Sequence, residues 1–415
     1  MKIYLVLILA FLIGNYLLDL VVRVLTRRGL SPDLPEEFRD LLDVEKYRRS
    51  RAYIRTNLRF GDWRSTIDLA VTLAFILLGG FCVVDRFARG FGFGMIFTGL
   101  IFLGVCALLN KLLHLPFAIY KTFVIEQKYG FNKTTPRTFV LDFFKGILLT
   151  VVIGGGIFAA ILWFFQTVGP LAWLYAWGAV VVILLIVQFV APVLIMPLFN
   201  KYTPLSEGEL KAALETYIHA QHFKMRGLFT MDGSRRSTHS NAFFTGFGRF
   251  RRIVLFDTLI EKHTVPELLT VVAHEMGHYK KHHVRYNIVM TIAINGLIFA
   301  LLPLFLYNAG LAAAFQMGRV SPYAGLMFFG FLFTPVSVFV GIFASVVSRR
   351  FEYQADAYAV TTTGQPEPMI TALKKLNVDN YGHLTPHPFV VFLRYSHPPV
   401  LERIRAIRRL ARHDG

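Results

Sequence analysis

Cysteine and charge are scarce in this chain of 415 residues. Its two cysteines, Cys82 and Cys106, both lie in apolar runs, which excludes a secreted scaffold held together by disulfides. Charged residues make up 17% of the sequence, whereas a soluble globular protein has about 25%. Hydrophobic residues make up 54%, and the mean hydropathy is +0.50. These values predict a polytopic membrane protein and not a soluble enzyme.

Acidic residues are scarcer than basic ones, since 26 Asp and Glu against 44 Lys and Arg give a formal net charge of +18. On a soluble protein this excess would suggest nucleic-acid binding. Here most of the basic residues follow the apolar runs and lie in four segments: 26–65, 110–138, 196–286 and 348–415. The positive-inside rule places these segments in the cytosol. We therefore expect no nucleic-acid partner, an N-terminus outside and a cytosolic C-terminus.

Seven stretches reach the roughly 20 apolar residues that a membrane-spanning helix needs. They are 3–25, 66–84, 91–109, 147–165, 171–195, 287–307 and 325–347. The last five contain no Asp, Glu, Lys or Arg. No small-residue cleavage site follows the first stretch, so we interpret it as a span and not as a signal peptide.

The most specific motif is H-E-M-G-H at residues 274–278. On a helix, His274 and His278 project to the same side and can bind one Zn²⁺ ion, while Glu275 can act as general base toward water. Residues 264–267, T-V-P-E, have the pattern of a capping box with proline in the first turn. These signals predict a helix that leads into the sixth span.

A catalytic zinc ion needs a third protein ligand and one open position. His282 and His283 follow the motif, but on a continuous helix they would lie further along the axis. We interpret them as basic residues at the membrane interface. Glu352 is the better candidate, because spans six and seven return the chain to the same membrane face. Asp356 lies one turn later and could accept a hydrogen bond from a ligating histidine.

Several further blocks accompany the zinc helix in a fixed order. They are E-Q-K-Y-G-F-N (126–132), S-R-R-S-T-H-S-N-A-F-F-T (234–245), I-V-L-F-D-T-L (253–259) and Y-S-H-P-P (395–399) followed by E-R (402–403). Together these blocks resemble the type I CAAX prenyl endopeptidases, a family of integral-membrane zinc proteases. The resemblance runs from about residue 120 to the end of the chain. It implies seven helices around a water-filled chamber, and removal of the last three residues from an isoprenylated CAAX-type C-terminus.

The resemblance also implies roles for single residues. Three match the zinc ligands: His274, His278 and Glu352. Glu275 matches the catalytic base, and Asp356 matches the carboxylate that accepts a hydrogen bond from a zinc-binding histidine. Three match residues of the cleft that bind the substrate backbone or the tetrahedral intermediate: Asn241, His397 and Arg403. Independently of the resemblance, residues 242–245 and 252–256 predict a strand pair with a turn at Gly246 and Gly248, whose edge could hold an extended peptide.

The prediction is an all-α polytopic membrane protein with seven transmembrane helices around a chamber. A zinc-metalloprotease domain, built from the zinc helix and a small β-hairpin, lies on its cytosolic side. We divide the chain into spans one to five (1–195), a catalytic segment (196–286), spans six and seven (287–347) and a catalytic C-terminal segment (348–415). The expected partners are one Zn²⁺ ion, membrane lipids and a peptide or protein substrate, with or without a lipid.

Short outer loops and a tail without a di-lysine retrieval signal favour a bacterial inner membrane, whereas a eukaryotic member would occupy the endoplasmic reticulum membrane. Two alternative functions stay open. A quality-control protease would apply the same chemistry to damaged or stalled membrane proteins. A non-catalytic channel or transporter would use the His/Glu cluster to carry or sense a metal, but it needs ionisable residues in several spans.

Overall fold

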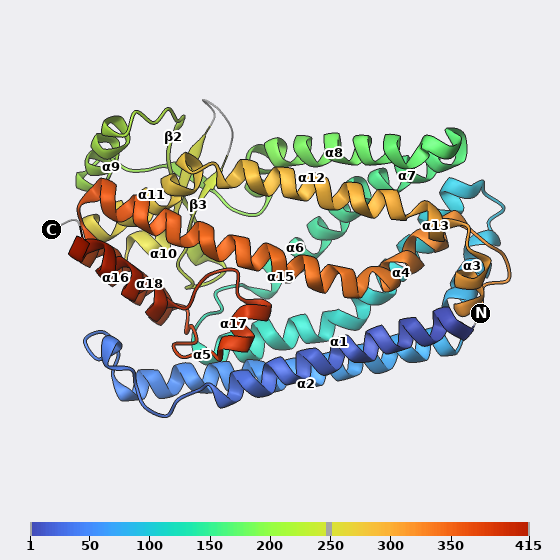
Figure 1. Ribbon diagram of the computed structural model, residues 1–415, viewed down its shortest axis with the longest axis horizontal. Helices are drawn as coiled ribbons and strands as arrows, with labels where there is room; N and C mark the ends of the chain where they lie inside the picture. Colours follow the sequence, from blue (N-terminus) through green and yellow to red (C-terminus); the bar gives the residue numbers. More distant parts are fainter. Residues whose placement is uncertain (1, 246–250, 414–415) are drawn as a thin grey trace.

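The computed structural model describes residues 2–245 and 251–413. The molecule is elongated, and its long helices run along the long axis, while the strands and most of the shorter helices of the second half gather at one end (Figure 1). The N-terminus and the C-terminus lie at opposite ends (Figure 1). The turn predicted at Gly246 and Gly248 lies outside the described residues.

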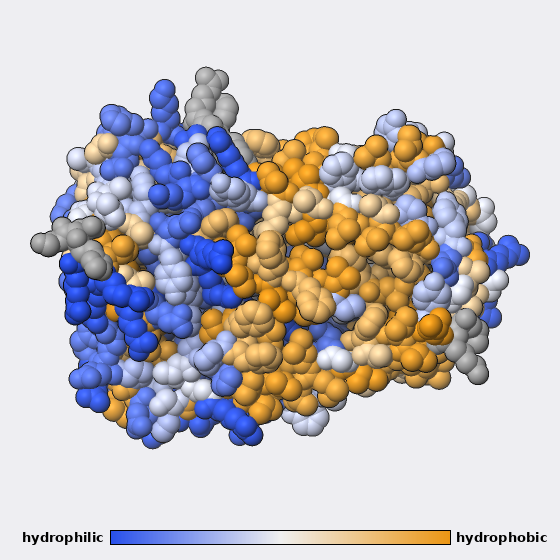
Figure 2. All heavy atoms as spheres, in the orientation of Figure 1, coloured by the Kyte–Doolittle hydropathy of each residue, from blue (hydrophilic) through white to orange (hydrophobic). Residues whose placement is uncertain are grey.

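Among the described residues, six helical stretches are long and apolar enough to cross a membrane: Ile3–Arg28, Met95–Tyr129, Pro136–Thr167, Gly169–Leu198, His283–Leu306 and Pro322–Thr363. A pair of helices that meet at 62°, Val44–Leu77 (α2) and Gly80–Arg89 (α3), passes the same test together. Counted as one span, this pair gives the predicted total of seven. Figure 2 shows a broad hydrophobic band across this face, with hydrophilic surface at both ends. The protein is a multi-pass integral membrane protein.

The second predicted span, 66–84, is therefore not one straight helix. α2 begins at Val44, within the loop predicted for 26–65, and the side chain of Asp43 caps it by accepting a hydrogen bond from the backbone N–H of Lys46 at 2.6 Å. After α2 ends, Gly79 adopts a left-handed conformation (φ +71°) that glycine tolerates without strain. Because the chain turns there, α3 leaves at an angle.

The remaining elements fall into two groups. The membrane region contains α1 (Lys2–Arg28), α4 (Met95–Tyr120), α5 (Gln127–Tyr129), α6 (Pro136–Leu149), α7 (Gly155–Thr167), α8 (Ala172–Val190), α12 (His283–Leu301), α13 (Pro303–Leu306), α14 (Ala309–Ala314) and α15 (Pro322–Thr363). The other end contains α9 (Glu209–Ala220), α10 (Asp257–Ile260), α11 (Val265–Lys280), α16 (Pro366–Asp379), α17 (Pro388–Arg394) and α18 (Val400–His413). Three π-helical segments extend the membrane helices: Lys121–Glu126, Thr150–Gly154 and Ala191–Ile195.

Four strands form one sheet in the described residues. They are β1 (Tyr202–Pro204), β2 (Gly227–Met231), β3 (Ala242–Thr245) and β4 (Arg252–Phe256), in the order β1-β2-β4-β3. β3 and β4 pair antiparallel as predicted, while β2 is parallel to β4. The predicted hairpin is thus part of a larger mixed sheet. The sequence does not predict the parallel pairing of β2 with β4, because parallel strands are not joined by a short turn with a recognisable pattern. β3 occupies an edge of this sheet.

α15 carries the last membrane span directly into the soluble end of the molecule. Its 42 residues extend over about 60 Å at 1.5 Å per residue, so the predicted span 325–347 covers only its N-terminal part. α15 packs on α11 at very short range, because a Cβ atom on Gly277 of α11 would lie 3.0 Å from Cα of Ala355. This close approach brings the carboxylates of α15 to the histidines of α11.

One hydrophobic core joins segments that are distant in the sequence. Phe38, Leu255 of β4, Val272 of α11, Ala372 of α16 and Ile407 of α18 are all buried in it. The N-terminal segment, the segment 196–286 and the C-terminal tail therefore pack together. This shared core fixes α11, α15 and α18 relative to one another.

Candidate metal centre

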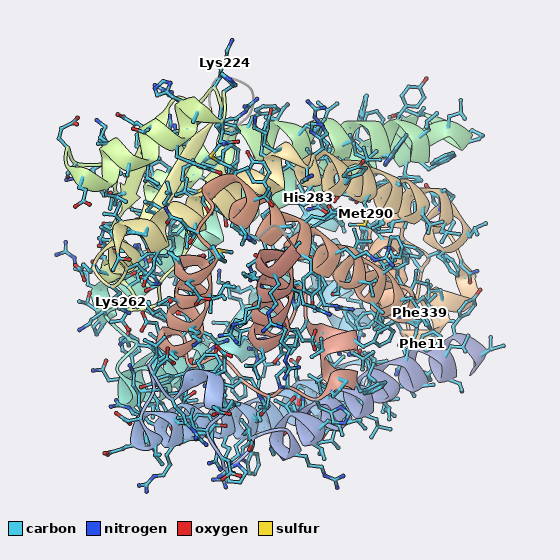
Figure 3. The ribbon with its side chains drawn as sticks, turned by 60° about the vertical axis from the view of Figure 1, so that its left-hand side comes forward. Phe11, Lys224, Lys262, His283, Met290 and Phe339 are labelled. Atoms are coloured by element: carbon cyan, nitrogen blue, oxygen red, sulfur yellow. The ribbon has the colours of Figure 1, made fainter. Side chains whose placement is uncertain are left out.

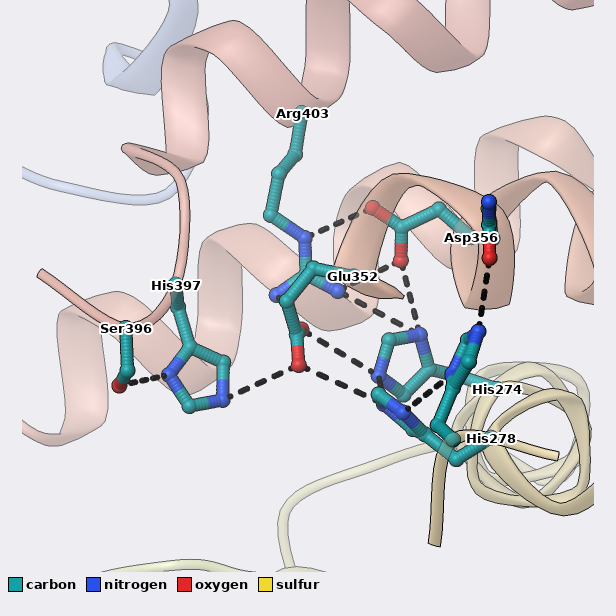
Figure 4. A network of polar contacts seen from close by, with 9 residues as sticks. His274, His278, Glu352, Asp356, Ser396, His397 and Arg403 are labelled. Carbon is teal, nitrogen blue, oxygen red and sulfur yellow. Dashed lines mark hydrogen bonds and ion pairs between the residues drawn. The ribbon is translucent and has the colours of Figure 1, made fainter. Parts of the chain in front are cut away.

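His274, His278 and Glu352 converge where α11 meets α15 (Figure 4). The predicted capping box of α11 is confirmed: Glu267 accepts a hydrogen bond from the backbone N–H of Thr264 at 3.0 Å. The Nε2 atoms of the two histidines lie 3.1 Å apart. They lie 3.5 and 3.4 Å from the two carboxylate oxygens of Glu352. All three candidate ligand atoms are within 4.8 Å of one another.

The chemistry of these three residues fits a zinc ion. Within the described part of the chain, Oε2 of Glu352 is buried and has no hydrogen-bond partner, and its ion pair with Nη1 of Arg403 is long, at 3.4 Å. A buried carboxylate oxygen in this state is costly unless further positive charge satisfies it. A cation between the two imidazoles and this carboxylate would supply that charge. Two imidazole nitrogens and one carboxylate oxygen are a known donor set of catalytic zinc sites.

Asp356 and Arg403 form a second layer behind the cluster. Oδ1 of Asp356 lies 2.8 Å from Nδ1 of His274. Arg403 donates two hydrogen bonds to the same carboxylate, at 2.7 Å from Nε and 2.6 Å from Nη2, and its Nη1 lies 3.4 Å from Glu352. Burial of His274 favours the neutral ring, but the hydrogen bond and charge of Asp356 outweigh it and raise the pKa of His274 above its ordinary value.

The buried pair of Arg403 and Asp356 predicts a large loss of stability on truncation. Their side chains are only 11% and 2% exposed. Arg403→Ala would leave buried carboxylates without their cation, so we expect a loss of about 3–5 kcal/mol in the free energy of unfolding. Thermal unfolding of the detergent-purified protein measures this, with Arg405→Ala, an exposed site on the same helix, as the matched control. Equal unfolding midpoints for the two variants would contradict the expectation.

Glu275 follows the first histidine on α11 and is half-buried. Desolvation raises the pKa of its carboxyl group, and the neighbouring His274 and His278 oppose this effect. A carboxylate with a raised pKa beside a metal site has the properties of a general base.

His397 and Asn241 lie at more open positions. His397, in the loop before α18, places Nε2 at 3.3 Å from Glu352 Oε1, yet its side chain is 63% exposed. Its Nδ1 lies 3.0 Å from Oγ of Ser396 (Figure 4). Asn241 is exposed directly before β3, where its Oδ1 accepts a hydrogen bond from the N–H of Ala242. The structure thus brings six of the eight predicted site residues together through contacts with Glu352 or α11: His274, His278, Glu352, Asp356, His397 and Arg403. Glu275 is adjacent to His274 in the sequence. Asn241 lies apart from them, at the start of the edge strand β3.

The interpretation of His283 as an interfacial residue is wrong. α11 ends at Lys280, His282 is exposed in a left-handed conformation (φ +63°), and α12 begins at His283. Because the chain turns at this point, the side chain of His283 is 1% exposed. Its Nδ1 lies 3.0 Å from Nδ1 of His278. The sequence signal for this contact is a histidine five residues after the second candidate ligand. A continuous helix would carry that histidine further along the axis, which is why the sequence alone predicts no contact with His278.

The E-Q-K-Y-G-F-N block supports the segment that leads to β3. Glu126 accepts a hydrogen bond from the hydroxyl of Tyr53 at 3.0 Å. The ring of Phe131 stacks on His239 with 4.1 Å between centroids. His239 in turn lies 2.8 Å from Oδ1 of Asn380 on the loop after α16. The block therefore ties the membrane helices to the soluble end of the molecule.

Comparisons with known proteins bear directly on this site. The family described as "CAAX prenyl protease N-terminal, five membrane helices" matches residues 25–201. The family described as "Peptidase family M48" matches residues 204–411, which include every residue of the cluster. The chain belongs to peptidase family M48. It is a membrane-embedded metallopeptidase, which favours an enzyme over a non-catalytic channel or transporter.

Relatives of this M48 peptidase match over nearly the full chain. A "CAAX prenyl protease 1 homolog" of Oryza sativa subsp. japonica is 35% identical over 413 residues, covering 97% of each chain. "CAAX prenyl protease 1" of Saccharomyces cerevisiae is 34% identical and covers 90% of this chain and 88% of that protein. The crystal structure of S. mikatae Ste24p has a TM-score of 0.93 at 32% identity, covering 97% of this chain and 99% of that chain. These matches confirm the predicted family and fold class.

Proposed function

We propose that this M48 peptidase is a zinc-dependent endopeptidase that cleaves near the C-terminus of CAAX-type substrates. The observation that carries the proposal is the convergence of His274, His278 and Glu352 beside the half-buried Glu275. The names of the relatives add the substrate class, since those proteins are called CAAX prenyl proteases.

His274, His278 and Glu352 would hold the zinc ion, and Asp356 would orient His274. When bound, zinc acts as a Lewis acid that polarises the peptide carbonyl and lowers the pKa of water. Zinc is the metal that two imidazoles and one carboxylate favour.

Glu275 would move the proton during cleavage. Its carboxylate accepts a proton from the attacking water as the water oxygen bonds to the carbonyl carbon. The protonated carboxyl group then gives that proton to the amide nitrogen as the C–N bond breaks. The released products are a new C-terminal carboxylate and the short peptide with a free amine. The raised pKa of Glu275 suits both steps, because the group must accept a proton and then release it.

The edge strand β3 offers the substrate backbone a place to bind. An extended peptide can add to a free strand edge through backbone hydrogen bonds, and Asn241 lies directly before this edge. His397, exposed and 3.3 Å from Glu352, would donate a hydrogen bond to the oxygen that becomes negative in the tetrahedral intermediate. Arg403 would act through Asp356 and Glu352, because its guanidinium group forms ion pairs with both of these carboxylates.

A cavity beside β3 gives room for an apolar group on the substrate. It has a volume of about 590 Å³, and its lining combines apolar side chains such as Leu184 of α8, Phe244 of β3 and Val284 of α12 with the basic side chains of Arg251 and Arg285. Only the apolar part of this lining suits an isoprenyl lipid, and the rest is polar.

The distribution of Lys and Arg supports a cytosolic position for the metal centre, with the N-terminus on the opposite side. The membrane would be the bacterial inner membrane or, in a eukaryotic cell, the endoplasmic reticulum membrane. The central chamber implied by the family resemblance stays a prediction.

Mass spectrometry of cleavage products tests the proposed function. A farnesylated CAAX peptide and its unprenylated twin are incubated with detergent-purified protein, and the Glu275→Gln variant serves as the control. We expect a single cut that releases the terminal tripeptide, faster for the lipidated peptide. Scattered cuts at equal rates in both peptides would instead indicate a quality-control protease, and no cut by zinc-loaded protein would overturn the proposal.

A further inference from the structure

His283 lies directly behind His278, on the side away from the carboxylate of Glu352. Figure 3 shows His283 at the start of α12, where this helix meets α15. Its Nδ1 lies 3.0 Å from Nδ1 of His278, and its Nε2 lies 2.8 Å from Oε1 of Gln354 on α15. A chain of polar contacts therefore runs from Gln354 through His283 to a candidate zinc ligand.

The ring of His283 is held in one orientation. It stacks on Phe351 of α15, with 4.0 Å between ring centroids and 10° between the planes. Its other neighbour is the ring of His278, which lies edge-on at 5.1 Å and 73°. With the side chain only 1% exposed, rotation of the ring would cost both contacts. The position of its two nitrogens is thus fixed by packing.

These contacts determine where the protons lie. A neutral imidazole has one donor and one acceptor nitrogen. The amide oxygen of Gln354 can only accept, so Nε2 of His283 carries the hydrogen and its Nδ1 is an acceptor. Nδ1 of His278 must then carry the hydrogen that this acceptor receives. The lone pair of His278 is left on Nε2, the atom that faces His274 and Glu352.

The two candidate ligands therefore have different supports. Nδ1 of His274 donates to a carboxylate, that of Asp356, whereas Nδ1 of His278 donates to a neutral imidazole. Negative charge behind a ligand makes it more basic. A neutral support sets the orientation and the tautomer without adding charge to a site that already contains Glu275, Glu352 and Asp356.

We propose that His283 and Gln354 are positioning residues that hold His278 in the tautomer able to bind the metal. This inference rests on the metal site proposed above, and it adds two residues to that site. The loss of a partner behind a ligand typically weakens metal binding by about 10- to 100-fold. The effect should depend on the acceptor at the position of Nδ1 and not on the bulk of the ring.

Zinc affinity of the full-length protein, measured by competition with a chelator, tests this chain of hydrogen bonds from Gln354 through His283 to His278, which we call the relay. We expect His283→Leu to weaken zinc binding by about 10- to 100-fold. His283→Asn keeps an acceptor oxygen close to the position of Nδ1, so it should recover most of the affinity. His222→Asn is the matched control, since His222 is exposed, lies away from the candidate metal site, and has a left-handed conformation that suits asparagine. This control should bind zinc as the wild type does.

The absorption spectrum of the cobalt-substituted protein gives a second readout. The His283→Leu variant should show altered d–d bands, because His278 is no longer fixed, while His283→Asn should resemble the wild type. Wild-type affinity in His283→Leu, or equal weakening by Leu and Asn, would overturn the relay.

Substitutions at Gln354, which is exposed, test the relay without touching the buried ring. Gln354→Glu keeps an acceptor and should bind zinc at least as tightly as the wild type, whereas Gln354→Leu should bind more weakly. Equal affinities would contradict the relay even if the His283 variants fail to fold. A wild-type protein that binds no zinc would instead overturn the proposed metal site itself.

Discussion

Glu275→Gln is expected to abolish peptide cleavage while zinc stays bound. Glutamine has nearly the same shape as glutamate but cannot accept a proton, so the attacking water loses its base. The loss of a general acid–base typically costs about 10²- to 10⁴-fold in rate. The zinc content should not change, because Glu275 is not one of the three residues grouped as candidate ligands.

Cleavage rates and zinc content, measured on the same preparation, check this expectation. Glu261→Gln is a suitable control, since Glu261 is exposed just before α11. This variant should cleave the peptide at the wild-type rate. Wild-type turnover in the Glu275→Gln variant would show that another group moves the proton.

Glu352→Ala is expected to remove zinc and activity together. This carboxylate is 3% exposed and faces both histidine Nε2 atoms, so its loss leaves two ligands where a catalytic zinc site needs three. The affinity should fall by more than about 100-fold, the upper end of the loss for a residue that only supports a ligand.

Metal analysis of the purified variant measures this loss. Glu367→Ala, an exposed glutamate in the first turn of α16, is the control and should keep one zinc ion per chain. Stoichiometric zinc in Glu352→Ala would mean that another side chain, such as His282 or His397, is the third ligand.

Much of the metal site could be predicted from the sequence because its signals are local or follow from membrane topology. The four-residue spacing of His274 and His278 places them on one helix face, and the capping box marks where that helix begins. Glu352 is 74 residues from His278, yet a hairpin of two spans returns the chain to the same membrane face. Helical spacing then predicts that Asp356 lies beside it.

Other features depended on contacts that leave no local pattern. The role of His283 depends on a left-handed residue at His282, which turns the buried ring back toward His278. Arg403 reaches Asp356 only because one hydrophobic core packs α18 against α15. β2 pairs with β4 across a long stretch of sequence, and the bend between α2 and α3 depends on the conformation of Gly79. Tertiary packing decided each of these features.

The most direct test of the central claim is to locate zinc by anomalous diffraction at its absorption edge, in crystals of the Glu275→Gln variant. This variant should hold zinc without turning over. The account predicts a single strong peak bounded by Nε2 of His274, Nε2 of His278 and the carboxylate of Glu352. A peak whose third protein ligand is His282 or His397, or no peak in protein whose wild type is active, would contradict it.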